Sequence, residues 1–169
     1  MKAAGVILAI AAALALQTTL ARYVVRGNIA LDFVLVAVVY VALIAGPSAG
    51  LLSGAIAGLI QDALSAPLIG IGGLAKTIVG FLAGIVGTQF IVVHSLPRFV
   101  VFFLATIVHA AVFMGLYAVL DLRHFGTPYA AVAGQAAGNS LVGVVAFQLV
   151  ELLPGAVERR RAGRGGTRR

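Results

Sequence analysis

The sequence lacks cysteine altogether, and charged residues make up only 10% of its 169 positions. Without cysteine, the chain can form neither disulfides nor thiolate metal sites. Soluble domains carry about 25% charged residues, so this chain cannot cover a surface that faces water. Instead, 62% of the residues are hydrophobic and the mean hydropathy is +1.11. The composition therefore predicts an integral membrane protein of one domain.

The net charge of +7 comes with only five acidic residues. Of the twelve basic residues, six lie within Arg159–Arg169, so the charge is not spread over a face. Nucleic-acid binding would need aromatic or base-reading residues beside the charge, and the sequence gives no such support. We interpret residues 153–169 as a basic, disordered cytoplasmic tail that contacts anionic lipid, at about 1 kcal/mol per arginine near the surface.

Apolar segments recur along the chain and predict an all-α fold of six transmembrane helices, since a spanning helix needs about 20 residues. Short polar or glycine-rich links separate these segments, and Gly46-Pro47-Ser48 is a tight turn. We expect a single, compact membrane domain over residues 1–152. The predicted helices are approximately 3–21, 29–46, 49–65, 74–93, 99–120 and 130–152.

The distribution of basic residues predicts the orientation. If the N-terminus is inside, the inner side holds Lys2, Arg98 and the six tail arginines, whereas the outer side holds Arg22, Arg26 and Arg123. Both termini are therefore expected in the cytoplasm. A cleaved signal peptide is the alternative for the first segment, because an apolar run follows Lys2. Gln17-Thr18-Thr19 interrupts that run, which then continues, so we retain six spans.

Small residues four apart form seams on three of the predicted helices, and in lipid such seams allow close helix packing. The first seam is Gly50, Gly54 and Gly58, the second is Gly80, Gly84 and Gly87, and the third is Ala130, Gly134 and Gly138. The seams either pack the bundle internally or receive a helix of another protein. Internal packing is the commoner use of such seams.

Polar residues within the apolar segments are few. Asp62, preceded by Gln61, flanks the first seam and lies at the same depth as Lys76, which predicts an ion pair. This pair is either structural or lines a polar site open to the outside. Asp32 suits the positive end of a helix dipole, and His109 is expected to bond between helices. No metal-ligand spacing and no nucleophile motif is present, which indicates that the protein is not an enzyme and needs no cofactor.

Several motifs together resemble the MreD family. They are Gln17-Thr18-Thr19, Asp32 before a valine-rich helix, Gly46-Pro47, the first seam with Asp62, Pro67–Gly70 and Lys76–Gly84. The resemblance covers residues 1–152 and is strongest over 46–84. The sequence departs from the family at Leu31, where proline often precedes the acid, and in its long arginine tail.

This resemblance implies a non-catalytic, multi-pass protein of the bacterial inner membrane that acts in cell elongation and peptidoglycan synthesis. The implied partners are an MreC-like protein, the RodA glycosyltransferase with its penicillin-binding partner, and the MreB filament indirectly. The family's fold is similar to that of the substrate-binding subunits of energy-coupling-factor vitamin transporters. A transporter subunit is therefore the alternative function.

Overall fold

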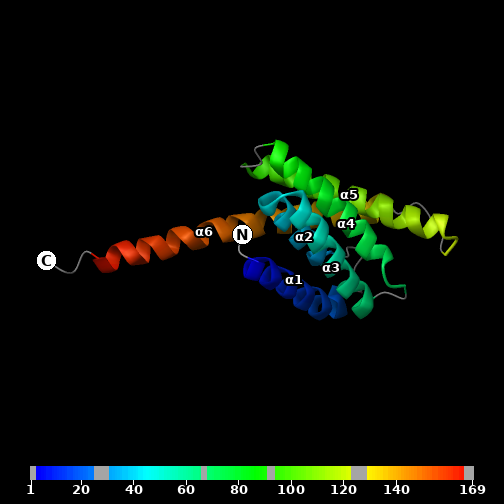
Figure 1. The fold of residues 1–169 in the computed structure, drawn as a ribbon, viewed down its shortest axis with the longest axis horizontal. Helices are drawn as coiled ribbons and strands as arrows, with labels where there is room; N and C mark the ends of the chain where they lie inside the picture. The colour runs from blue at the N-terminus through cyan, green and yellow to red at the C-terminus, as the bar shows by residue number, and fades with distance from the viewer. Residues whose placement is uncertain (1–2, 25–30, 66–67, 91–93, 123–128, 166–169) are drawn as a thin grey trace.

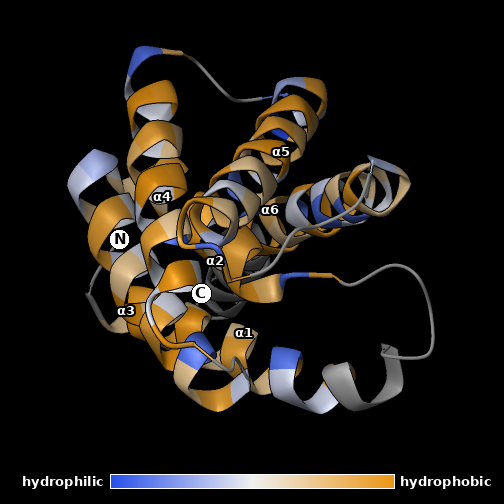
Figure 2. Cartoon of the chain, turned by 90° about the vertical axis from the view of Figure 1, so that its right-hand side faces the viewer, coloured by the Kyte–Doolittle hydropathy of each residue, from blue (hydrophilic) through white to orange (hydrophobic). Residues whose placement is uncertain are grey.

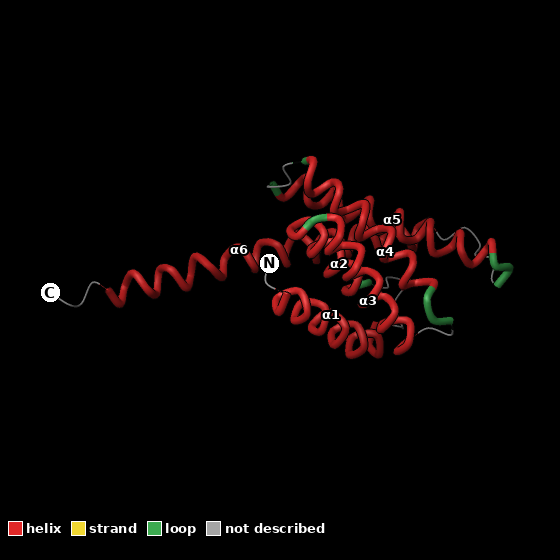
Figure 3. Tube along the Cα trace, viewed as in Figure 1, coloured by secondary structure: helices red, strands yellow, loops and turns green. Residues whose placement is uncertain are grey.

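The computed structural model describes residues 3–24, 31–65, 68–90, 94–122 and 129–165, and within them all regular structure is helical (Figure 3). The helices follow one another in the order predicted from the sequence. They are α1 (Ala3–Val24), α2 (Phe33–Ala45), α3 (Pro47–Ser65), α4 (Ile71–Gln89), α5 (Ser95–Val119) and α6 (Tyr129–Gly165).

Helices α3, α4, α5 and α6 each begin before their predicted starts. In α3 and α5 the reason is that proline is tolerated in the first turn of a helix. Pro47 opens α3, and Pro97 lies in the first turn of α5, which starts at Ser95. The parts of the predicted segments at 29–30 and 91–93 lie outside the described residues.

Three helical stretches of the described chain are long and apolar enough to cross a membrane: Ile71–Gln89, Ser95–Val119 and Tyr129–Leu152. Ala4–Leu20 and Phe33–Ala45 are apolar but shorter. By length and composition, these data support a helical membrane protein with three candidate spans. They do not establish the predicted number of six.

The tail prediction needs correction, because α6 continues beyond residue 152 to Gly165. Alanine, glutamate, leucine and arginine are strong helix formers, and they dominate this part of the tail. Figure 1 shows this continuation projecting away from the other helices, toward the same side of the view as the N-terminus. Residues 166–169 lie outside the described part.

Helix α2 is the centre of the bundle and packs against each of the other five helices. Valine dominates its sequence, so it has no polar face to turn outward. Its residues Val34, Val38, Val39, Val41 and Ala42 have no exposed surface. Because α2 is enclosed, a polar group at its end can reach several helices at once.

The outer surfaces of the surrounding helices are apolar, as Figure 2 shows by hydropathy. Leu52 on α3, Leu104 on α5 and Leu149 on α6 are each more than half exposed. Single exposed leucines are ordinary in soluble proteins, but here apolar residues cover several helices. Such a surface fits a lipid environment.

Candidate functional site

The first small-residue seam lies against α4. A Cβ added to Gly54 would lie 2.6 Å from the carbonyl carbon of Lys76, and one added to Gly58 would lie 2.6 Å from Cα of Gly73. Gly50 meets Gly80 in the same way, backbone to backbone. The hypothesis that this seam receives a helix of another protein is therefore wrong, because α4 already fills it.

The second seam completes this contact. Gly80 meets Gly50, while Gly84 lies against Pro47 and Gly87 against Leu43. Complementary seams on α3 and α4 thus let the two backbones approach closely, as small residues do in membrane bundles.

The third predicted seam, on α6, is less enclosed. Gly134 and Gly138 are half-buried. It is Gly143 that packs closely on this helix, beneath the ring of Phe102, where a Cβ would come within 2.6 Å of ring carbons. The sequence prediction therefore missed this close glycine contact of α6.

Asp32 and Lys76 form a buried ion pair, with 2.9 Å between the carboxylate oxygen Oδ2 and Nζ. The two side chains are 9% and 4% exposed. Nζ of Lys76 also lies 3.3 Å from Nε2 of His109. A buried ion pair needs further hydrogen bonds to offset its desolvation, and His109 together with the α2 N-terminus supplies them. This cluster joins α2, α4 and α5.

Asp32 is also the N-cap of α2, since its Oδ1 accepts a hydrogen bond of 2.9 Å from the backbone N–H of Leu35. Its position therefore satisfies a backbone donor that would otherwise lack a partner at the helix end. The two carboxylate oxygens thus have different partners: Oδ1 caps the helix, and Oδ2 pairs with Lys76.

Two side-chain amides hold the backbone around Asp32. Asn139 of α6 accepts a hydrogen bond from the N–H of Asp32 at 3.0 Å and donates to Oγ1 of Thr106 on α5 at 3.2 Å. Gln17 of α1 accepts from the N–H of Phe33 at 2.8 Å and donates to the carbonyl of Leu31 at 3.1 Å. The start of α2 is thus tied to α1, α4, α5 and α6.

Asp62 does not form the predicted pair with Lys76. Its Oδ2 instead accepts hydrogen bonds from the backbone N–H groups of Gly70, at 2.9 Å, and Gly73, at 3.0 Å. These groups lie at the start of α4, whose N-cap Gly70 has no side chain to accept them. Asp62 therefore caps α4 from α3, and the cation that was assigned to it pairs with Asp32.

A polar cavity of about 360 Å³ lies beside this cluster, and Asp62 and Lys76 both line it. Helices α2 to α6 all contribute to its walls. The remaining lining residues are Asp32, Gln61, Ser65, Gly72, His109, Ala110, Phe113, Met114, Val132 and Gln135. The cavity is partly open, so the predicted polar site has a counterpart here even though the predicted ion pair does not.

Gln61 stands apart from the hydrogen-bond network. Its side-chain oxygen Oε1 is buried and has no hydrogen-bond partner. A buried polar atom without a partner costs free energy and calls for an explanation. The residue lines the polar cavity, but Oε1 itself has no surface open to it.

A second charged cluster lies at the other end of the bundle. The guanidinium of Arg98 on α5 makes two hydrogen bonds to the carboxylate of Glu151 on α6, at 3.0 and 2.5 Å. Its Cζ lies 4.4 Å from the ring centroid of Phe147, which also contacts Tyr40. Glu151 is 55% exposed, so this cluster joins α5 to α6 near the bundle surface.

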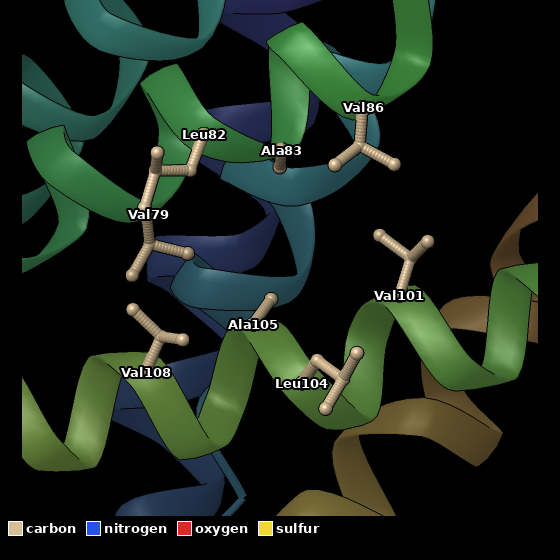
Figure 4. Close-up of a pocket in the computed structure, with 8 residues that line it drawn as sticks. All are labelled: Val79, Leu82, Ala83, Val86, Val101, Leu104, Ala105 and Val108. Atoms are coloured by element: carbon tan, nitrogen blue, oxygen red, sulfur yellow. The ribbon is translucent and has the colours of Figure 1, made fainter. Parts of the chain in front are cut away.

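Apolar hollows open elsewhere on the bundle. Figure 4 shows one of about 170 Å³ between α4 and α5, where Val79, Leu82 and Val86 lie across from Val101, Leu104 and Val108. A larger cleft of about 510 Å³ separates α1 from α3 and is lined by residues such as Ile7, Ile10 and Ile56. Neither hollow carries charge.

Sequence reasoning missed Asn139 as a partner of Asp32, and it missed the Arg98–Glu151 cluster. The signal for Asn139 was its position as a strong hydrogen-bonding group inside an apolar segment, where such groups bond between helices. The signal for Arg98 and Glu151 was that two residues of opposite charge lie near the ends of neighbouring segments. Neither signal names a partner by itself.

The comparison with curated proteins found no match, and neither did the comparison with solved structures. The expected similarity to transporter subunits therefore gains no support from the comparisons. A family model of the rod shape-determining protein MreD matches residues 2–153, which is most of the chain and includes the Asp32 cluster and both paired seams. The chain therefore belongs to the MreD family of rod shape-determining membrane proteins.

Proposed function

We propose that this protein is a non-catalytic scaffold of the bacterial rod-shape machinery, which spans the inner membrane six times and keeps both termini in the cytoplasm. Membership of the MreD family supports the role in shape determination. The scaffold role rests on one structural observation: the buried charges are engaged within the chain, between helices. Lys76 holds Asp32, while Asp62 caps α4.

This arrangement suits a rigid binding partner rather than a catalyst. Charges at membrane depth are expensive, and here they are offset by contacts that fix the positions of the helices. The outward surface is left apolar. The partner proposed is an MreC-like protein, with RodA and its penicillin-binding partner in the same assembly and MreB contacted indirectly. The basic tail contacts anionic lipid at the inner surface.

The partner contact cannot use the two paired glycine seams, since they pack α3 against α4. We place it at the cleft between α1 and α3, where α1 leaves part of α3 uncovered and the lining is apolar apart from Ser53. The proposed scaffold role requires association within the membrane, and close apolar packing drives such association.

Co-purification with an MreC-like protein tests both statements. Ile56→Trp fills the α1–α3 cleft, while Leu104→Trp fills the α4–α5 hollow and serves as the matched control. We expect the partner to be recovered with the wild type and the control, and to be lost with Ile56→Trp at equal expression. If the partner is recovered equally with the wild type and both variants, the contact lies outside the α1–α3 cleft. If the partner is recovered with none of the three, the scaffold proposal is contradicted.

The orientation is testable because the chain has no native cysteine. Single cysteines at Ser48 and Ser65 lie at opposite ends of α3. In intact cells, a membrane-impermeant maleimide should label Ser65→Cys and spare Ser48→Cys. The reverse pattern contradicts the proposed orientation.

The polar cavity favours a second candidate function, the substrate-binding subunit of a vitamin transporter. Ligand pockets commonly measure about 300–1,000 Å³, and this cavity lies within that range. Native mass spectrometry of the purified protein separates the candidates: a tightly bound vitamin-sized molecule supports the transporter, and a bare mass counts against it.

A further inference from the structure

The polar cavity beside Lys76 is lined by more negative than positive side chains. The proposed scaffold role does not require this excess of negative charge. Two carboxylates, Asp32 and Asp62, and one ammonium, Lys76, line it. The ammonium is paired with Asp32. Asp62 is bonded to backbone N–H groups, which supply only the partial positive charge of a helix end. The lining therefore keeps an excess of negative charge around Asp62.

The neighbouring groups of the cavity are also rich in hydrogen-bond acceptors. Gln61 precedes Asp62 on α3, and its buried Oε1 has no partner. Ser65 lies one turn further along the same helix and Gln135 faces them from α6. Ser65 and Gln135 each carry an oxygen that can accept a hydrogen bond from an occupant with N–H donors.

The cavity lining also includes apolar side chains. Phe113 and Met114 of α5 and Val132 of α6 supply them. Ligand sites characteristically combine such side chains with a few convergent polar groups. A cavity lined by both an aromatic ring and a carboxylate also suits an organic cation, because the face of the ring attracts positive charge.

We propose that this cavity binds a small organic cation, a protonated primary amine with a short apolar body. Its ammonium donates to Asp62, and its apolar part lies against Phe113 and Met114. An anion is disfavoured because Lys76 is already neutralised by Asp32. A metal ion is disfavoured because no group of three or more histidine, cysteine or acidic residues gathers within the described ranges.

Binding of phenethylammonium chloride to the full chain in detergent tests the proposal by isothermal titration calorimetry. Its neutral isostere 2-phenylethanol and the anion 3-phenylpropionate are the matched controls. We expect saturable binding of the amine, with affinity about tenfold or more above either control, since one charge-assisted hydrogen bond contributes on that scale. Equal affinity for the alcohol, or binding that does not saturate, overturns the proposal.

Variants locate the site. Asp62→Asn keeps an oxygen that can cap α4 and removes the charge, so it should fold normally and bind the amine about tenfold more weakly or worse. Val132→Phe fills the apolar side of the cavity and should also abolish binding. Glu151→Gln, at the other end of the bundle, removes an acid without touching the cavity and should bind as the wild type does.

Wild-type affinity in Asp62→Asn, or an equal loss in Glu151→Gln, overturns the assignment. If Asp62→Asn fails to fold, Val132→Phe tests the assignment in its place, because unchanged amine binding in that variant would also contradict a site in this cavity. None of these outcomes depends on recovery of a partner protein. Failure of this inference and failure of the scaffold proposal are therefore separate results.

Discussion

Lys76→Met tests the buried ion pair most directly. The substitution keeps a long side chain on α4 but leaves Asp32 buried without its cation, although the bond to Leu35 remains. Breaking one side of a buried pair commonly costs about 3–5 kcal/mol. Because Asp32 keeps its cap bond and can take up a proton, we expect a loss near the lower end, about 3 kcal/mol.

The double variant separates pairing from packing. Asn at position 32 can still cap α2, so Asp32→Asn with Lys76→Met removes both charges and leaves no orphaned ion. We expect it to be more stable than the sum of the single losses predicts. The coupling should be at least about 1.5 kcal/mol, within the range for residues in contact.

Asp62→Asn with Lys76→Met is the matched control, since the sequence alone assigned this pair. The structure engages Asp62 with backbone donors, so these two changes should couple far less than the Asp32 pair. The measurement is unfolding in mixed micelles followed by circular dichroism, because the chain has no tryptophan to report by fluorescence. A larger coupling for Asp62 than for Asp32 would refute the reasoning.

Three further predictions use the same assay. Gly54→Ala should destabilise by about 1–3 kcal/mol through overpacking against α4, whereas Gly115→Ala, where an added Cβ meets nothing within 4 Å, should not destabilise; equal effects would mean that the seam is not close-packed. Asn139→Ala should cost about 1–3 kcal/mol because it leaves the buried N–H of Asp32 without its acceptor and Oγ1 of Thr106 without its donor, and a loss under 0.5 kcal/mol, the scale of ordinary surface changes, would contradict that role. Asp62→Ala should be less stable than Asp62→Asn by about 1 kcal/mol, the usual worth of a cap, and equal stability would argue against capping.

Composition and spacing were sufficient to predict the helical membrane fold and the order of its helices. They were also sufficient to find the seam residues of α3 and α4, because small residues four apart have few other uses in lipid. What spacing could not decide was the occupant of the Gly50–Gly58 groove. The occupant is the second seam, Gly80–Gly87. A short link joins α3 to α4, so the two helices form an antiparallel hairpin in which their seams face each other.

The ion pair was assigned to the wrong acid because matched depth is not sufficient to identify a partner. Asp32 and Asp62 both lie at the end of the bundle where α4 begins, and Asp62 is the nearer of the two to Lys76 along the chain. The glycine-rich start of α4 distinguishes them. Gly70 has no side chain to cap the helix, so the free N–H groups require an acceptor from another helix, and Asp62 is the acid whose helix joins directly to α4.

The contacts of Asp32 with Asn139 were beyond the reach of sequence spacing, since 107 positions separate the two residues. Only the packing of α6 beside α2 brings them together. The close packing of α3 on α4 likewise leaves the Gly50–Gly58 and Gly80–Gly87 seams with no room for a helix of a partner. The small residues of α3 and α4 and the buried charges make their contacts within the bundle. A partner in the membrane can therefore bind the outer apolar surface. A small molecule can bind the cavity that is lined by Asp62, which has no ion-pair partner there.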